Sequence, residues 1–274
     1  MSLMISPVQV LDAARIIIAS IFLIYASWRD YRSREVSNTV WILFAPLAFT
    51  LTFLEIYIYE FPQLPFYGIC FSLTTAFALM LFYSGGFGGA DAKAIMCLAL
   101  ALPFHPENLF KPFFSEVSLI SQTFFPLTVF SNSVLLAAAT AIYMFLQNVF
   151  WRHKTGRDLF EEEHKSESIW RKLLVLVSGY HIPIVRLKEK WHLYPLEDVE
   201  KNGNNLRRKL IILPKDEGRE KIIQRLEDAA EEGEIQSTVW ATPGLPMLIF
   251  ITGGLVAALF FGDIVWICIS FLLG

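Results

Sequence analysis

Six apolar segments, separated by short polar loops and one long polar stretch, make up most of the chain. The hydrocarbon core of a bilayer is about 30 Å thick, and a helix needs roughly 20 apolar residues to cross it. The fourth segment is short, because its 14 residues reach only some 21 Å at about 1.5 Å each. We therefore expect a polytopic α-helical membrane protein with six transmembrane helices, the fourth of which begins inside the membrane or at its edge. The segments cover residues 10–28, 39–59, 66–84, 91–104, 125–150 and 243–272.

The long polar stretch, residues 151–240, lies between the fifth and sixth apolar segments. It holds 34 of the chain's 49 Lys, Arg, Asp and Glu residues. The rest of the sequence therefore has far fewer charged residues than a water-soluble protein. We expect a small α+β cytoplasmic domain here, which divides the chain into 1–150, 151–240 and 241–274. Its expected elements are helices over 168–178 and 216–232 and strands near 182–187 and 207–213.

The basic residues of the short loops predict the orientation in the membrane. The loop after the first apolar segment carries Arg29, Arg32 and Arg34, whereas the next loop has no basic residue and the loop over 105–124 has only Lys111. Because Lys and Arg are enriched in cytoplasmic loops, the first loop and the polar insert should face the cytoplasm. Both termini should then lie outside the cell membrane.

Composition and charge exclude several classes of function. The formal net charge is −3, and the insert balances 17 basic against 17 acidic residues, so neither nucleic-acid binding nor a polybasic lipid-binding patch is expected. The N-terminal residues lack the basic start and small-residue cleavage site of a secretory signal peptide. Three cysteines, Cys70, Cys97 and Cys268, fall inside apolar runs and are expected to be buried small side chains.

Ionisable residues within the apolar segments are functional candidates, because a charge in lipid is costly unless it is paired or hydrated. Near the expected outer face, Asp12, Glu55 and Asp263 are interpreted as interfacial or paired charges, with Arg15 three residues from Asp12 as a local partner. The remaining candidates lie at the cytoplasmic edge, and they are Asp30, Asp91 and Lys93.

Asp30 and Asp91 form a candidate catalytic pair. Asp91 follows the glycine-rich sequence SGGFGGAD, which lacks the Gly-Lys-Ser/Thr of a phosphate-binding loop. Two carboxylates brought close together share one proton, so one can take a proton from water while the other donates to a carbonyl oxygen, without a metal or a cofactor. The chain has no H-E-x-x-H and no G-x-S-x-G sequence. Because Asp91 begins one helix and Asp30 ends another, helix dipoles favour Asp91 as the base and Asp30 as the acid.

The same residues resemble a known family. Asp30 with Val36-Ser37-Asn38, and Gly88-Gly89-Ala90-Asp91-Ala92-Lys93, are similar to the two signatures of the type IV prepilin peptidase and archaeal preflagellin peptidase superfamily, membrane aspartyl proteases with a G-x-G-D motif. Ala90 stands where the bacterial form has glycine, as in the archaeal variant. Thr242-Pro243-Gly244-Leu245-Pro246 and Gly262-Asp263 resemble the last-span signature of the archaeal preflagellin peptidases, and the insert is also like that subfamily.

The resemblance implies a function and a site. Asp30 and Asp91 would be the catalytic residues, Gly88 and Ala90 would shape the loop, and Lys93 would support the motif. The expected partners are membrane lipid and a preflagellin- or prepilin-like precursor, whose short signal peptide would be removed at the cytoplasmic membrane face. The N-terminal cysteine cluster of bacterial relatives that also methylate their product has no counterpart here, so no methylation is expected.

Two other interpretations remain open from the sequence. A protease similar to presenilin or signal peptide peptidase would also use two aspartates, but six segments rather than nine and the unmatched Pro-Ala-Leu motif count against it. An ion-coupled transporter could use Asp30, Asp91, Lys93 and the glycine break as a coordination site. The absence of two similar halves in the sequence counts against this second alternative.

Overall fold

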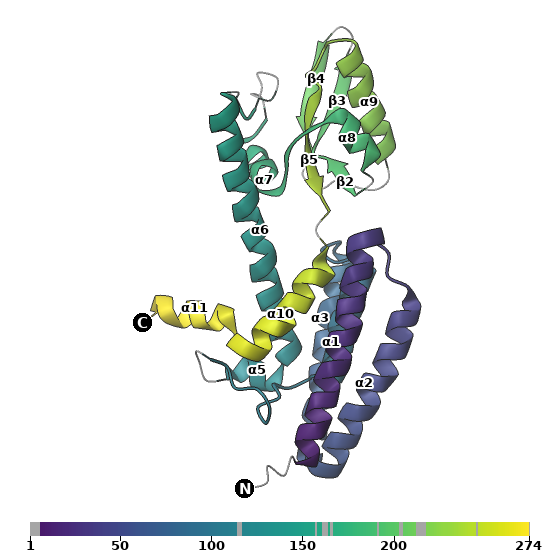
Figure 1. Cartoon of the computed structure of the whole chain (residues 1–274), viewed down its shortest axis with the longest axis vertical. Coiled ribbons are helices and arrows are strands. Elements are labelled where there is room, and N and C mark those ends of the chain that lie inside the picture. The colour runs from purple at the N-terminus through teal and green to yellow at the C-terminus, as the bar shows by residue number, and fades with distance from the viewer. Residues whose placement is uncertain are drawn as a thin grey trace. The chain divides into compact units, whose positions relative to one another are not determined.

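A computed structural model of the chain contains two compact units, which are described separately (Figure 1). Unit 1 comprises Met1–Ala137 and Pro246–Gly274, and unit 2 comprises Ala138–Leu245. Unit 2 therefore includes the end of a long helix as well as the polar insert. The structure describes residues 6–113, 117–156, 158–160, 164, 167–190, 192–202, 205–211, 218–244 and 246–273.

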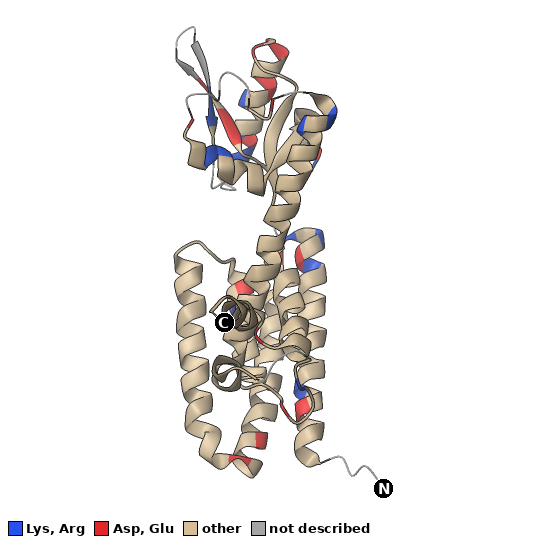
Figure 2. Ribbon diagram, turned by 90° about the vertical axis from the view of Figure 1, so that its left-hand side faces the viewer, with Lys and Arg blue, Asp and Glu red and all other residues tan. Residues whose placement is uncertain are grey.

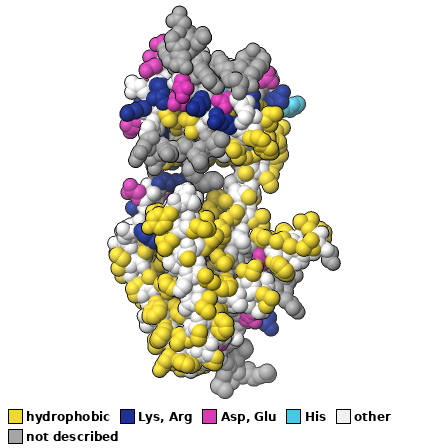
Figure 3. All heavy atoms as spheres, turned by 180° about the vertical axis from the view of Figure 1, so that it is seen from behind, with side chains coloured by type: hydrophobic (Ala, Val, Ile, Leu, Met, Phe, Trp, Pro, Cys, Tyr) yellow, Lys and Arg dark blue, Asp and Glu magenta, His cyan; other side chains and the backbone are white. Residues whose placement is uncertain are grey.

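Unit 1 is helical, and its surface is that of a membrane protein. Among the described residues, four helical segments that lie wholly or partly in unit 1 are long and apolar enough to cross a bilayer: α1, α2, η1 with α3, and α6. Charged residues are sparse along these helices and numerous on unit 2 (Figure 2), and hydrophobic side chains cover much of the face of unit 1 seen in Figure 3. The elements are α1 (Pro7–Ser33), α2 (Asn38–Tyr59), η1 (Phe61–Gln63), α3 (Leu64–Tyr83), α4 (Gly89–Ala101), α5 (Leu119–Thr123), α6 (Phe125–Thr155), α10 (Met247–Phe261) and α11 (Ile264–Leu273).

The short fourth segment forms α4, a helix of 13 residues that is packed inside unit 1. It contacts α1, α2, α3 and α10, and its small side chains allow these helices to approach. At about 1.5 Å per residue it covers only some 20 Å, too little for a complete crossing of a 30 Å core. Helix length therefore does not establish six complete crossings. The buried residues of α4 are Ala92, Ala94, Ile95, Cys97, Leu98, Ala99 and Ala101.

The sixth apolar segment is not the continuous helix expected over 243–272. It consists of α10 and α11, which meet at an angle of 58°, and residues 238–243 before them belong to a strand. Gly262 at the break has a φ of 74°, which only glycine adopts readily. The side chain of Asn132 on α6 hydrogen-bonds to the backbone on both sides of the break. Its Nδ2 donates to the Gly262 carbonyl at 2.8 Å, and its Oδ1 accepts from the Ile264 N–H at 3.1 Å. Cys268 on α11 is exposed, unlike the buried Cys70 and Cys97, so the prediction for Cys268 is wrong.

Two adjacent glycines of α10 face α6 with very different clearance. A Cβ on Gly254 would lie 2.5 Å from the Val129 carbonyl oxygen and 2.9 Å from the Ser133 nitrogen, both backbone atoms. A Cβ on Gly253 would meet only the tip of the Leu136 side chain, at 3.1 Å. The packing of α10 on α6 therefore depends on the missing side chain at Gly254.

We predict that Gly254→Ala destabilises unit 1 by about 1–3 kcal/mol, because two helix backbones must move apart. Gly253→Ala is the matched control, and its effect should be under about 1 kcal/mol because a leucine side chain can turn aside. Thermal unfolding of the two variants in the same detergent measures the difference. Equal melting temperatures for the two variants would contradict the close approach of α10 and α6.

Unit 2 has two small antiparallel sheets. One sheet has the strand order β1-β5-β2 and the other pairs β3 with β4. The expected α+β character is present, but residues 184–187, expected as strand, are the start of a helix because Ile184 and Leu187 turn to the same buried side. The remaining elements are α7 (Ile169–Ser178), β1 (Tyr180–Pro183), α8 (Ile184–Glu189), β2 (Leu193–Pro195), β3 (Glu197–Asn202), β4 (Asn205–Leu210), α9 (Arg219–Glu231) and β5 (Thr238–Pro243).

These bounds test the other elements expected in the insert. The helix over 168–178 is confirmed as α7, with Ser168 as its N-cap. The strand near 207–213 is found as β4, which ends at Leu210, and residues 212–213 lie outside the described residues. The second expected helix is found as α9, which begins at Arg219, and residues 216–217 also lie outside the described residues.

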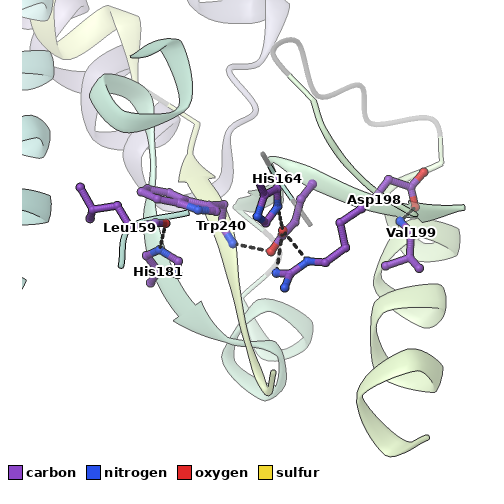
Figure 4. Close-up of polar contacts among 8 residues, drawn as sticks. Leu159, His164, His181, Asp198, Val199 and Trp240 are labelled. Carbon is purple, nitrogen blue, oxygen red and sulfur yellow. Dashed lines mark hydrogen bonds and ion pairs between the residues drawn. The ribbon is translucent and has the colours of Figure 1, made fainter. Parts of the chain in front are cut away.

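A buried carboxylate, that of Glu197, forms an ion pair within one sheet of unit 2 and a hydrogen bond to the other (Figure 4). Glu197 at the start of β3 and Arg208 on β4 are almost fully buried, and Arg208 Nη2 lies 2.9 Å from Glu197 Oε2. The second carboxylate oxygen accepts from the backbone N–H of Trp240 in β5 at 2.8 Å. His164 Nε2 lies 3.0 Å from Glu197 Oε2. Because β3 and β5 belong to different sheets, the carboxylate fixes one sheet against the other.

Acid should weaken this arrangement. Burial by itself would raise the pKa of Glu197, but the hydrogen bond with His164 and the charge of Arg208 outweigh it and hold the pKa below its usual value. Burial lowers the pKa of His181 on β1. In both cases the unfolded chain binds a proton more readily than the folded one, so stability falls as pH falls. For His181 the loss begins below about pH 6.5, and for Glu197 below about pH 4.5.

We predict that Glu197→Gln destabilises unit 2 by roughly 3–5 kcal/mol, because the buried Arg208 loses its ion pair with Glu197. Glu200→Gln is the control, since Glu200 lies on the same strand, is exposed, and pairs with Lys209 at 3.7 Å. Its effect should stay within about 0.5 kcal/mol. Hydrogen exchange of full-length protein, followed on peptides from β5, measures both changes, and faster exchange at pH 5 than at pH 7 after correction for intrinsic rates tests the acid effect.

Candidate active site

The candidate site lies where the ends of α1, α2, α4 and α10 meet. Asp30 is in the last turns of α1, and its carboxylate lies near the backbone N–H of Leu248 at the start of α10. Ser27, one turn earlier, donates to the Leu248 carbonyl at 2.8 Å. These contacts fix Asp30 against the amino end of α10, a partner 218 positions away in the sequence.

Asp91 is held by the amino end of its own helix. It is the third residue of α4, and its Oδ2 accepts from the Gly88 N–H at 3.1 Å. A Cβ on Gly88 would lie only 3.0 Å from that same oxygen, so glycine gives the carboxylate room to reach the backbone. Gly85, at the end of α3, has a φ of 78° and lets the chain turn sharply before α4. This explains in physical terms two of the glycines before Asp91.

The structure brings the two predicted aspartates together at one end of unit 1. Their charges are close enough to interact, and both side chains are partly buried. The charge of Arg34 also interacts with each carboxylate. A pair of carboxylates with one neighbouring cation is an arrangement that can hold and move a single proton.

Arg34 has an unusual backbone. It caps α1 with a φ of 55°, and among the described residues it is the one non-glycine residue with positive φ. Its backbone N–H donates to the carbonyl oxygen of Asp30 at 3.0 Å. Arginine pays a cost of about 1 kcal/mol for this left-handed conformation. The turn after α1 therefore places a guanidinium beside the two carboxylates.

The other predicted residues of the motif join α4 to its neighbours. Lys93 Nζ donates to Asn38 Oδ1 at 2.6 Å, which ties the first turn of α4 to the first residue of α2. Ala90 is partly buried and packs against the core of unit 1, as does Phe87 in the preceding loop. Phe87 stacks edge-on against Phe130 of α6, with ring centroids 5.6 Å apart.

The contact of Asp30 with α10 changes the electrostatic argument made from the sequence. Considered alone, the negative carboxyl end of α1 would favour the protonated form of Asp30 and hence its role as the acid. Because Asp30 also lies against the positive amino end of α10, both aspartates contact helix amino ends. Helix dipoles therefore do not separate the two roles.

The remaining ionisable residues form bonds elsewhere in unit 1, as expected. Arg15 Nη2 bonds to Asp12, and it lies 2.7 Å from Glu55 Oε1 on α2, so one guanidinium joins α1 to α2. All three side chains are buried, and Asp12 lies 18 residues before Asp30, about 27 Å along α1. Asp263 caps α11 by accepting from the Trp266 N–H at 3.0 Å.

Sequence reasoning did not find Arg34 or the start of α10 as parts of this site. Arg34 was used only to orient the first loop, and no local signal distinguishes it from Arg29 or Arg32. The contact with Leu248 depends on chain folding, although the sequence TPGLP at 242–246 does mark a helix start.

Two family models match separate parts of the chain. The model of the type IV leader peptidase family matches residues 17–144, a range that includes Asp30 and Asp91. The model of the archaeal peptidase A24 C-terminus, type II, matches residues 171–264. Together the two models cover most of the chain.

Individual relatives extend over nearly the same length. The preflagellin peptidase of Methanococcus voltae is 27% identical over 251 residues, which are 88% of this chain and 92% of the relative. That of Methanococcus maripaludis is 25% identical over 261 residues, 90% of this chain and 94% of the relative. That of Methanocaldococcus jannaschii is 26% identical over 186 residues, 64% and 77% respectively. Over residues 17–144 the chain carries the domain of the type IV leader peptidase family, and over residues 171–264 it carries the archaeal type II C-terminal part of peptidase A24.

Proposed function

We propose that the protein is a membrane-embedded aspartyl endopeptidase that removes the short signal peptide from preflagellin (archaellin) or prepilin-like precursors, without methylating the product. The proximity of Asp30 and Asp91, from α1 and α4, is the single observation that carries this proposal. The names of the three relatives support the substrate class. The family favours this function over the presenilin-like protease and the ion-coupled transporter.

The proposed reaction is hydrolysis by a water molecule held between the two carboxyl groups. One carboxylate takes a proton from the water as its oxygen attacks the carbon of the scissile carbonyl, and the other, protonated, donates to the carbonyl oxygen. When the resulting diol collapses, the C–N bond breaks and a proton passes to the leaving amine. The proton count returns to its starting value, so the pair needs no cofactor.

Arg34 and Lys93 are proposed as positioning residues for this pair. Arg34 reduces the repulsion that two neighbouring carboxylates would otherwise experience, because its charge acts on both of them. Lys93 holds the first turn of α4 to α2 through Asn38, so the Asp91 carboxylate keeps its place relative to α1. Neither residue is required to touch the reacting atoms.

The proposed topology places the aspartates at the cytoplasmic face of the cell membrane. Six crossings then require α4 and the bent α10–α11 pair to count as spans, with both termini outside. The arginines after α1 favour this orientation by the positive-inside rule. A precursor whose basic leader stays in the cytoplasm and whose apolar helix enters the bilayer would bring its scissile bond to the depth of Asp30 and Asp91.

We predict that Asp30→Asn and Asp91→Asn each reduce cleavage of a preflagellin precursor by at least about 10²–10⁴-fold, because each removes a proton donor or acceptor. Glu35→Gln is the control, since Glu35 is an exposed carboxylate in the loop next to Asp30. Asp12 and Asp263 are poorer controls because both are buried and hydrogen-bonded. Cleavage is followed by gel shift in membranes, and an Asp30→Asn variant with full activity would end the proposal.

A second prediction tests the proximity of the two aspartates directly. In a background with Cys70→Ser, Cys97→Ala and Cys268→Ser, the double variant Asp30→Cys/Asp91→Cys should be joined by a bifunctional thiol reagent spanning about 8 Å. Asp12→Cys/Asp91→Cys is the control and should not react across, because Asp12 lies about 27 Å from Asp30 along the same helix. Mass spectrometry of the linked peptides reads the result, and cross-linking at equal rates in both pairs would contradict the arrangement.

A further inference from the structure

Helix α7 of unit 2 presents an apolar face that no described residue covers. At 100° per residue, Ile169, Trp170, Leu173, Leu174 and Val177 fall within one arc of about 140°. The first four are exposed, and Ile169 and Trp170 keep 74% and 76% of their surface accessible. A water-facing helix of an otherwise charged domain rarely carries such a continuous apolar stripe.

The side chains on the opposite side of α7 pack against, or pair with, other residues of unit 2. Val175 and Leu176 are buried in the core that also contains Trp240. Arg171 pairs with Glu167 at 3.0 Å, and Lys172 lies over the ring of Phe160 at 5.9 Å. These contacts fix the orientation of α7 about its own axis. Its apolar face therefore points away from the rest of unit 2.

The position of α7 along α6 indicates what covers that face. Asn148 of α6 donates to the carbonyl oxygens of Leu176 at 2.8 Å and Gly179 at 2.7 Å, so the end of α7 is tied to this level of α6. Asn148 is the twenty-fourth residue of α6, about 35 Å from its start, which is near the far edge of a 30 Å hydrocarbon core.

The surface of α6 is consistent with a bilayer edge at this level. Its exposed side chains from Val134 to Phe150 are apolar except for Gln147, and the basic residues Arg152, His153 and Lys154 follow Trp151. Trp151 lies at the change from apolar to basic, as aromatic residues do at membrane interfaces. In Figure 3, hydrophobic side chains gather on the side of the insert where α6 lies. The lipid that covers α6 therefore ends at the level where α7 is attached.

We propose that α7 is an interfacial helix, and that its face of Ile169, Trp170, Leu173, Leu174 and Val177 enters the boundary between headgroups and acyl chains beside α6. Amphipathic helices with Trp and Leu on one face and basic residues on the other bind membranes in this way. The polar insert is then held on the bilayer by α7 as well as by its covalent connections. This inference depends on α6 being a membrane span and not on the chemistry of Asp30 and Asp91.

The test measures which solvent each side chain meets. Full-length protein lacking its native cysteines is reconstituted into phosphatidylcholine liposomes, and a nitroxide is attached to Trp170→Cys. Electron paramagnetic resonance then compares collisions with oxygen, which concentrates in lipid, and with a water-soluble nickel chelate. Val185→Cys is the matched control, because Val185 on α8 is an apolar residue of unit 2 with 66% of its surface exposed. Phe150→Cys on α6, also 66% exposed, is the lipid reference.

The expected result is an oxygen-to-nickel collision ratio several-fold higher at 170 than at 185 and close to that at 150. Labels moved through 169–178 should repeat the high ratio at 169, 173, 174 and 177. A ratio at 170 equal to that at 185 would overturn the proposal, because α7 would then face water. Shielding of 170 from both collision partners would overturn it in favour of a covering protein surface. Because the labels at 169, 170, 173 and 174 replace exposed side chains, hydrogen exchange of β5 should be unchanged in these variants and shows that unit 2 remains folded.

Discussion

Both carboxylates of the candidate site lie at the amino ends of helices. A helix begins with N–H groups that have no partner within the helix, and in a membrane these groups must be satisfied by protein. Asp91 accepts a hydrogen bond from Gly88 at the start of α4, and Asp30 lies near the backbone N–H of Leu248 at the start of α10. The amino ends of two helices therefore lie beside the two acidic groups. Displacing either helix would change the geometry of the site.

Close approach of backbones is the second requirement, and glycine meets it at particular positions. Gly88 leaves room for the Asp91 carboxylate, and Gly254 lets α10 lie directly against α6. The second contact matters for the first aspartate as well, because α10 carries the Leu248 N–H that Asp30 contacts. A displacement of α10 would move one partner of the site without touching either carboxylate.

The charged residues of unit 1 are divided between its two ends by the cost of burying charge. Arg15 joins Asp12 and Glu55 at one end, where each carboxylate has a cation within bonding distance. At the other end, Asp30 and Asp91 share the more distant charge of Arg34 and are left with oxygen atoms free of a direct ion pair among the described residues. A fully paired carboxylate is a poor base, so this unequal pairing leaves Asp30 and Asp91, rather than Asp12 and Glu55, available for the proposed reaction.

The amino-acid sequence was enough to predict a helical membrane protein and to single out the two aspartates on which the proposed chemistry rests. Long apolar runs require lipid, so the helical membrane unit and the polar insert could be predicted from composition alone, and the spacing of Asp30 and the glycine-rich loop before Asp91 marked the two acidic groups. How these groups are positioned depends on contacts between distant segments. The bend at Gly262 depends on Asn132 of another helix, the helix at Ile184 depends on burial of Leu187, and the position of Asp30 depends on the packing of α1 against the start of α10 at Leu248. These contacts join residues that local periodicity cannot relate, because periodicity reports the face of a helix and not the partner that the face meets.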